Sequence, residues 1–241
     1  MQKGGLKILI IVLIALIPLV TRGNKPLLAK ADSLFQEKRY TQSLEIYQAL
    51  FEDHHYSPAM LLKMAYIQEG LNRIAQSTYY LNLYYLATHD DSALTKLEEL
   101  AGKYKLEGYS SDEISKIYSL YQQYKNLVTL VLASVIVFLF VLSLTLKLRF
   151  KTKPIATWCV LLLMAVVLLM HINLSDRFSQ AIIVNNNTYL MDKPSAGASV
   201  IEIVRDGHRV KILGKKDVWI KVTWGDSEVY IKESSVLPIQ L

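Results

Sequence analysis

Two long apolar runs joined by a short basic linker limit the folds open to this chain more than any other feature. Residues 127–148 carry no charge before Lys147, and residues 155–174 contain no ionised side chain. At about 1.5 Å of rise per helical residue, each run spans about 30 Å, which is the thickness of the hydrocarbon core of a bilayer. We therefore expect a hairpin of two transmembrane helices, 127–148 and 155–174. A helical hairpin in the core of a soluble protein is the alternative.

The loop between the runs, residues 149–154, predicts the orientation of this hairpin. Four bases and no acid lie in this loop or just before it: Lys147, Arg149, Lys151 and Lys153. Such an excess beside membrane spans stays on the cytoplasmic side, so we expect a cytoplasmic loop and both open ends on the other side. The same four residues account for most of the net charge of +6. The segments on either side of the hairpin are nearly neutral, and their charge therefore does not indicate nucleic-acid binding.

The amino-terminal residues 1–23 have the pattern of a secretory signal. Lys3 and Lys7 precede an apolar run of about 13 residues that ends near Pro18 and Val20. We expect either a signal peptide or an uncleaved membrane anchor, and both would export the segment that follows. The chain has one cysteine, Cys159, so cysteine usage does not indicate a redox compartment.

Residues 24–126 contain a repeat with a period of 34 residues. Ala31 recurs as Ala65 and Ser43 as Ser77, and the large side chains Tyr47 and Leu81 keep the same spacing. This pattern resembles the tetratricopeptide repeat (TPR), in which small residues let two antiparallel helices approach closely. A third, degenerate copy starts near Ser92. We expect a helix over 111–147 whose first turns complete the repeat stack before it enters the membrane.

The carboxyl-terminal residues 181–241 have the alternation of a small all-β barrel. Six short segments rich in β-branched residues are separated by turn signals: 181–184, 189–191, 200–204, 209–213, 218–223 and 229–232. Thr188-Tyr-Leu-Met-Asp-Lys-Pro, Asp217-Val-Trp219 and the closing Ser235-Val-Leu resemble a bacterial SH3 (SH3b) domain. Such domains often bind cell-wall peptides. Asp192 and Val229-Tyr230 depart from the pattern of the family, so the resemblance implies the fold and no ligand site.

The sequence contains no pattern that indicates catalysis, a metal or a cofactor. Glu52-Asp53-His54-His55 has the composition of a metal site, but adjacent histidines on a helix point in different directions, and a helix end favours His for its dipole. His171, near the end of the second apolar run, is expected to reach the interface or pair with another helix. By analogy with other TPR proteins, five side chains could line a partner groove: Asp32, Phe35, Leu62, Tyr66 and Glu69.

The order of these segments defines a multidomain membrane protein: an α-helical TPR solenoid, a two-helix transmembrane hairpin and an all-β SH3b-like barrel. This order resembles the TPR-and-SH3 membrane proteins of the aerotolerance (Bat) operons of Bacteroidetes. The resemblance implies a multi-pass protein of the bacterial inner membrane with periplasmic soluble domains and membrane-anchored von Willebrand A-domain partners. We expect a non-enzymatic adaptor or scaffold. The alternative is an envelope sensor that binds peptidoglycan through its SH3b domain.

Overall fold

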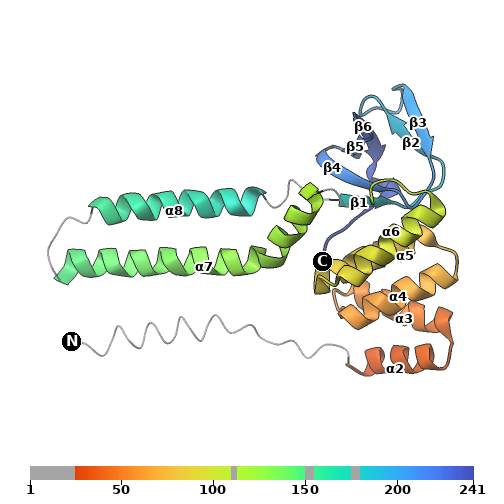
Figure 1. The fold of residues 1–241 in the computed structure, drawn as a ribbon, viewed down its shortest axis with the longest axis horizontal. Helices are drawn as coiled ribbons and strands as arrows, with labels where there is room; N and C mark the ends of the chain where they lie inside the picture. Colours follow the sequence, from red (N-terminus) through yellow and green to blue (C-terminus); the bar gives the residue numbers. More distant parts are fainter. Residues whose placement is uncertain (1–24, 110–112, 150–154, 175–179) are drawn as a thin grey trace. The chain divides into compact units, whose positions relative to one another are not determined.

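The structure is a computed structural model that describes residues 25–109, 113–149, 155–174 and 180–241. Its contacts divide the chain after Ser57 into two compact units. The described residues form seven α-helices and one antiparallel sheet of seven strands (Figure 1). The predicted signal or anchor, residues 1–23, lies outside the described residues, as do Lys151 and Lys153 of the basic linker.

The first four helices form two pairs, one in each unit. Helices α2 (Lys25–Gln36) and α3 (Tyr40–Glu52) belong to the first unit, and α4 (Pro58–Gly70) and α5 (Ile74–Thr88) to the second. The turn within each pair contains one residue with a positive φ, Lys38 at 61° and Asn72 at 58°. These two residues are 34 positions apart, so the backbone repeats with the period of the sequence.

A matching hydrogen bond holds each pair of helices together. The Ser43 hydroxyl donates to the carbonyl oxygen of Ala31 at 2.8 Å, and the Ser77 hydroxyl donates to that of Ala65 at 3.0 Å. All four residues are buried. Small side chains at these positions allow the helix backbones to approach closely. Because the backbones are close, each serine hydroxyl can donate a hydrogen bond to a carbonyl oxygen of the facing helix. The predicted role of the small residues is therefore supplemented by a polar contact that the sequence period did not reveal.

Helix α6 (Asp91–Tyr104) follows the second pair, close to the predicted start at Ser92. The Asp90 side chain caps its first turn by accepting the backbone N–H of Ser92 at 3.0 Å. The side-chain hydroxyl of Ser92, this backbone bond and the Tyr84 hydroxyl, which donates to the other carboxylate oxygen, hold the pKa of Asp90 below its ordinary value. The helix ends at Lys105, whose φ of 50° is left-handed.

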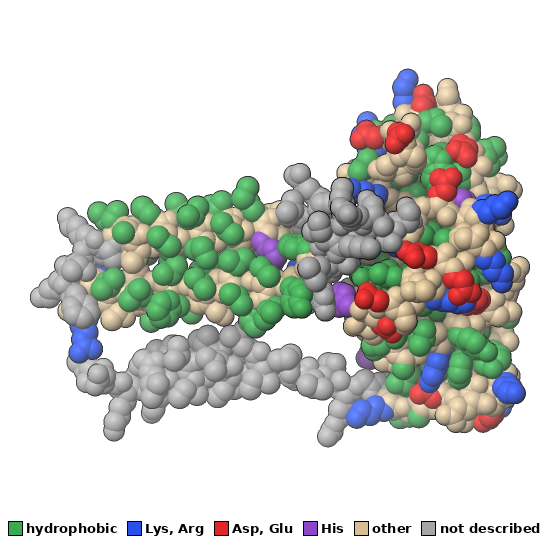
Figure 2. All heavy atoms as spheres, in the orientation of Figure 1, with side chains coloured by type: hydrophobic (Ala, Val, Ile, Leu, Met, Phe, Trp, Pro, Cys, Tyr) green, Lys and Arg blue, Asp and Glu red, His purple; other side chains and the backbone are tan. Residues whose placement is uncertain are grey.

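Helices α7 (Glu113–Arg149) and α8 (Ile155–Leu174) carry the two apolar runs, and α7 is continuous, as predicted. Both are long and apolar enough to cross a membrane, over Tyr124–Arg149 and Ile155–Asn173. Only 6% of the most apolar window of α7 and 0% of that of α8 are buried within the described protein, whereas a soluble core helix would be mostly buried. Hydrophobic side chains cover their visible face in Figure 2. The predicted docking of the first turns of α7 concerns side chains outside the described set.

The carboxyl-terminal residues form the sheet, in the strand order β3-β2-β6-β5-β4-β1-β7. The strands are β1 (Gln180–Ile183), β2 (Thr188–Met191), β3 (Val200–Val204), β4 (Arg209–Lys216), β5 (Trp219–Trp224), β6 (Ser227–Lys232) and β7 (Val236–Pro238), with a 3-10 turn at Glu233–Ser235. Each of the six predicted segments coincides with a strand. Strand β4 extends to Lys216, into the predicted turn at 214–217, and after a register shift between Ile212 and Gly214 it stays paired with β5 as far as Lys216 and Trp219. The chain then reverses at Asp217, whose φ is 56°.

The sheet encloses its own hydrophobic core. Ten buried side chains form one cluster: Ala181, Ile183, Leu190, Val204, Val210, Ile220, Val222, Val229, Ile231 and Val236. They come from all seven strands of the sheet. This cluster therefore consists only of residues of the sheet, which we call the barrel below.

Candidate functional site

The predicted groove residues of the first unit already have partners within their own helix pair. The Tyr47 hydroxyl donates to Asp32 Oδ1 at 2.5 Å. Burial and this carboxylate both raise the pKa of the Tyr47 phenol, burial more strongly. The ring of Phe35 meets that of Tyr40 edge-on, with centroids 5.4 Å apart. Both predicted residues thus help to join α2 to α3, and their predicted contact with a partner protein stays a prediction.

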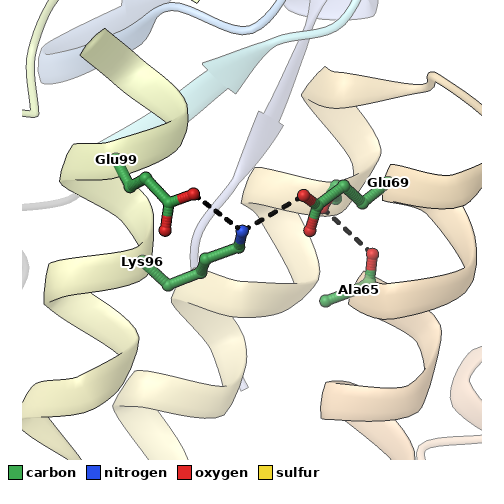
Figure 3. Close-up of polar contacts among 5 residues, drawn as sticks. Ala65, Glu69, Lys96 and Glu99 are labelled. Carbon is green, nitrogen blue, oxygen red and sulfur yellow. Dashed lines mark hydrogen bonds and ion pairs between the residues drawn. The ribbon is translucent and has the colours of Figure 1, made fainter. Parts of the chain in front are cut away.

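The three predicted residues on α4 differ among themselves. Leu62 and Tyr66, one helical turn apart, are 43% and 58% exposed. Glu69 is instead engaged: Lys96 of α6 lies 3.2 Å from its carboxylate and 3.4 Å from that of Glu99 (Figure 3). The ion pair links α4 to α6 at a partly exposed site, where its contribution to stability is small. The structure therefore leaves Leu62 and Tyr66 as the most accessible of the five predicted groove residues.

The barrel has a cavity of about 440 Å³ on its surface. Two aromatic residues line it: Trp219, which is buried, and Tyr189, which is 54% exposed. The remaining wall is mainly amide, hydroxyl and apolar groups: Asn185, Asn186, Asn187, Thr188, Met191, Ala196, Val200, Lys232 and Ser235. Aromatic rings beside amide groups suit a peptide or sugar ligand. The sequence assigned no ligand site to the barrel, so this cavity is a candidate that only the structure reveals.

A third feature is the junction between the helices and the barrel of the second unit. The segment after α6, from Tyr104 to Tyr109, lies against the turn between β3 and β4, from Arg205 to Arg209. The Glu107 N–H donates to Nδ1 of His208 at 3.0 Å, and the Arg209 N–H donates to the carbonyl oxygen of Glu107 at 3.0 Å. Two segments about a hundred residues apart in sequence are thus joined by one backbone–backbone bond and by one bond to a histidine side chain.

Arg209 anchors this junction from the barrel side. Its guanidinium donates to the Gly108 carbonyl at 2.8 Å and to the Asn82 amide oxygen of α5 at 3.1 Å. The same group lies over the ring of Tyr109, 4.7 Å from its centroid. Arg205 also donates to the carbonyl oxygen of Tyr104. The planar, five-donor guanidinium can satisfy several acceptors at once, which a lysine cannot do.

Two glycines allow the segments to approach. Gly108 has a φ of 86°, and a Cβ atom there would lie 1.9 Å from the carbonyl oxygen of Arg209. Gly207 has a φ of 95°, and a Cβ atom would lie 3.0 Å from the Leu106 side chain. Tyr109 is buried beside them and donates its hydroxyl to the Gly207 carbonyl at 2.8 Å. Burial raises the pKa of Tyr109 to about 12, against the opposing effects of a hydrogen bond with the Thr78 side chain and of the charge of Arg209.

The two apolar helices meet at one polar cluster. Nδ1 of His171 lies 2.9 Å from the Tyr121 hydroxyl, and Nε2 lies 3.0 Å from the Thr129 hydroxyl. Both ring nitrogens of His171, on α8, therefore contact α7. The prediction that this histidine pairs with another helix is confirmed, and its partners are hydroxyl groups.

The described residues contain no group of three or more His, Cys, Asp or Glu side chains that could hold a metal ion. His54 lies beyond the end of α3 with a φ of 57°, and His89 ends α5 with a φ of 53°. No protein-family model matches the chain, and a search of curated proteins finds no match. The functional conclusion therefore depends on the chain's own residues.

Proposed function

We propose that this protein is a non-enzymatic, membrane-anchored adaptor that presents two recognition modules for protein–protein interaction. The observation that carries the proposal is the junction at His208 and Arg209, which holds a helix pair and a barrel in one unit. Each module has its own accessible surface, Leu62 and Tyr66 on α4 and the cavity beside Trp219 on the barrel. A fixed spacing between two such surfaces is what a scaffold needs to bring two ligands together.

The identity of the modules is part of the proposal. We take the helix pairs as TPR units because the buried Ala–Ser contacts recur at 34 residues. We take the barrel as an SH3b-like domain because of its short antiparallel strands and the 3-10 turn before β7. In both cases the support comes from residues that the family patterns share with this chain.

The proposed location is the bacterial inner membrane, crossed by α7 and α8, with both modules in the periplasm. The support is the length and apolar surface of the two helices, together with the bases at their connection, which include Lys147 and Arg149 at the end of α7. The resemblance to the Bat-operon proteins suggests membrane-anchored von Willebrand A-domain proteins as partners, and a role in an aerotolerance or envelope-stress complex.

The α4 surface is tested by capture of partners from detergent-solubilised membranes of the native host. We expect Leu62→Asp combined with Tyr66→Ala to reduce partner recovery at least tenfold, because both changes remove exposed apolar contact area. Leu71→Asp is the matched control, since Leu71 is similarly exposed but lies in the turn after α4. Equal recovery by the double variant and the control would refute the adaptor role of this face.

A second candidate function is cell-wall binding through the barrel, and the cavity beside Trp219 favours it. The full chain in detergent should then sediment with purified peptidoglycan at low salt. Tyr189→Ala should abolish sedimentation, whereas Val218→Ala should not, because Val218 is equally exposed and does not line the cavity. No sedimentation of the wild-type chain would exclude this function.

A further inference from the structure

The junction contains a buried histidine whose ring must be neutral for the observed contact. His208 is 7% exposed, and its Nδ1 accepts a hydrogen bond from the Glu107 N–H at 3.0 Å. An imidazolium has no lone pair on either nitrogen, so a protonated His208 cannot accept this bond. Protonation would instead place two N–H groups against each other. The contact between the helical segment and the barrel is therefore possible only with neutral imidazole.

Charged groups and one aromatic ring surround His208 and affect its protonation. Glu107 faces it from the segment after α6, Glu202 from β3, and Arg205 and Asp206 from the β3–β4 turn. Arg209 follows it in β4, and the ring of Trp224 from β5 meets it edge-on at 5.1 Å. Three carboxylates and two guanidinium groups therefore lie around His208. Burial is the largest effect and lowers the pKa of His208 below its ordinary value in spite of the carboxylates.

Each module has packing of its own on either side of the junction. The core cluster of the barrel contains only barrel residues, and the α4–α5 pair is held by its buried residues and the Ser77–Ala65 bond. Across the junction, His208, Arg209 and Arg205 take part in hydrogen bonds, Tyr109 is buried, and α5 also contacts β1. A charge on the His208 ring removes one of these hydrogen bonds and so favours the released arrangement.

We propose that protonation of His208 releases the barrel from the helical segment at Glu107, so that docking of the two modules depends on pH. The docked state binds a proton at His208 more weakly than the released state does. Docking is thus at full strength above the ordinary pKa of histidine, 6.5, and weakens as the pH falls below that value. This device goes beyond the adaptor function and does not depend on which partner the modules bind.

The test measures the distance between the modules in the full chain in detergent micelles. Spin labels at Ser92 of α6 and Ser227 of β6, both exposed, in a Cys159→Ser background report docking by pulsed electron resonance. From pH 7.5 to pH 5.0, the docking equilibrium constant should fall by at most about 30-fold, the limit for a group that is protonated only when released. The released molecules should appear as a second, broader distance distribution.

Two variants distinguish the effect of His208 protonation from the effects of other titrating groups. His208→Asn keeps an acceptor oxygen near the position of Nδ1 and cannot titrate, so it should stay docked at pH 5.0. His89→Asn is the matched control, because Asn suits the left-handed φ of this half-buried residue outside the junction, and it should respond to acid as the wild type does. An unchanged wild-type distance distribution between the two pH values would overturn the proposal. An acid response that persists in His208→Asn would overturn it equally. The labelled chain with His208 intact changes no residue of the junction, so that measurement does not depend on the folding of a junction variant.

Discussion

The hydroxyl group of Ser77 donates a hydrogen bond to the backbone carbonyl of Ala65 at 3.0 Å, and Ser43 makes the same bond to Ala31. The contact spans twelve residues and joins the two helices of each pair. The 34-residue period of the sequence therefore corresponds to a repeated contact in the structure. The stability of the α4–α5 pair should depend on the size of residue 77 more than on its polarity.

The first prediction concerns this contact. Ser77→Ala removes one buried hydrogen bond and should lower the free energy of unfolding by about 1 kcal/mol. Ser77→Leu should cost about 2–3 kcal/mol, because a large side chain cannot fit where the helix backbones meet. The urea midpoint of the far-ultraviolet circular dichroism of the full chain measures both. The same changes at exposed Ser227 of β6 should have little effect, and a tolerated leucine at position 77 would contradict the close approach.

The second prediction concerns Gly108. A Cβ atom at this position would overlap the Arg209 carbonyl at 1.9 Å, and the φ of 86° is strained for any other residue. Gly108→Ala should therefore open the junction while leaving both modules folded. Hydrogen–deuterium exchange in residues 104–109 should become faster, and exchange in β5 and β6 should not change.

Gly102→Ala is the control for this experiment. Gly102 lies within α6, and a Cβ atom there would meet nothing within 4 Å. Alanine at a helical position should stabilise the chain by up to about 1 kcal/mol without affecting exchange at the junction. Equal exchange in the two variants would show that the segments do not approach as described.

The third prediction concerns alkaline pH. Tyr109 has a pKa raised from 10.0 to about 12, because its phenol is buried, so the docked junction favours the neutral form. The contribution of the neutral Tyr109 phenol to the free energy of unfolding is complete below pH 10. It should decline by up to about 3 kcal/mol as the pH rises toward 12. The urea midpoint should fall less steeply between pH 9.5 and 11.5 in Tyr109→Phe than in the wild type. Tyr66→Phe, at an exposed site, should retain the wild-type slope.

Local patterns in the sequence predicted the elements of this fold well. Helix α6 begins where Asp90 and Ser92 can cap it, and the strands coincide with β-branched segments between turns. The junction was not predictable in the same way. Gly108 and Gly207 indicate turns on their own, but no local pattern states that the two turns meet across about a hundred residues.

The groove residues show the same limit at the level of side chains. Analogy with other TPR proteins selected Leu62, Tyr66 and Glu69, and the first two are exposed. It did not identify Lys96, which comes from α6 and engages Glu69. Periodicity reveals which face of a helix a residue occupies, whereas its partners depend on how helices pack.

The fourth prediction concerns His171. Replacing it by alanine removes both ring-nitrogen contacts to α7, with Tyr121 and Thr129, and should weaken the pairing of α7 and α8 by about 1–2 kcal/mol. Cysteines in place of Phe140 and Trp158, whose rings lie 6.5 Å apart, allow chemical cross-linking of the two helices in detergent. Cross-linking should be slower in His171→Ala. Asn173→Ala should not change it, because the Asn173 amide donates within its own helix to Leu169.

The last prediction concerns the topology of the hairpin. Single cysteines at Ser92, Thr152 and Ser227 in a Cys159→Ser background can be labelled in intact cells with a membrane-impermeant maleimide. We expect Ser92 and Ser227 to react from outside the inner membrane and Thr152 only after lysis. The physical reason is the cluster of four bases around Thr152, since cytoplasmic loops retain such an excess. Labelling of Thr152 in intact cells would invert the topology and place both modules in the cytoplasm. The junction at His208 would then be exposed to the buffered cytoplasmic pH and not to the pH outside the inner membrane. The labelling result therefore also decides to which of these two pH values the docking would respond.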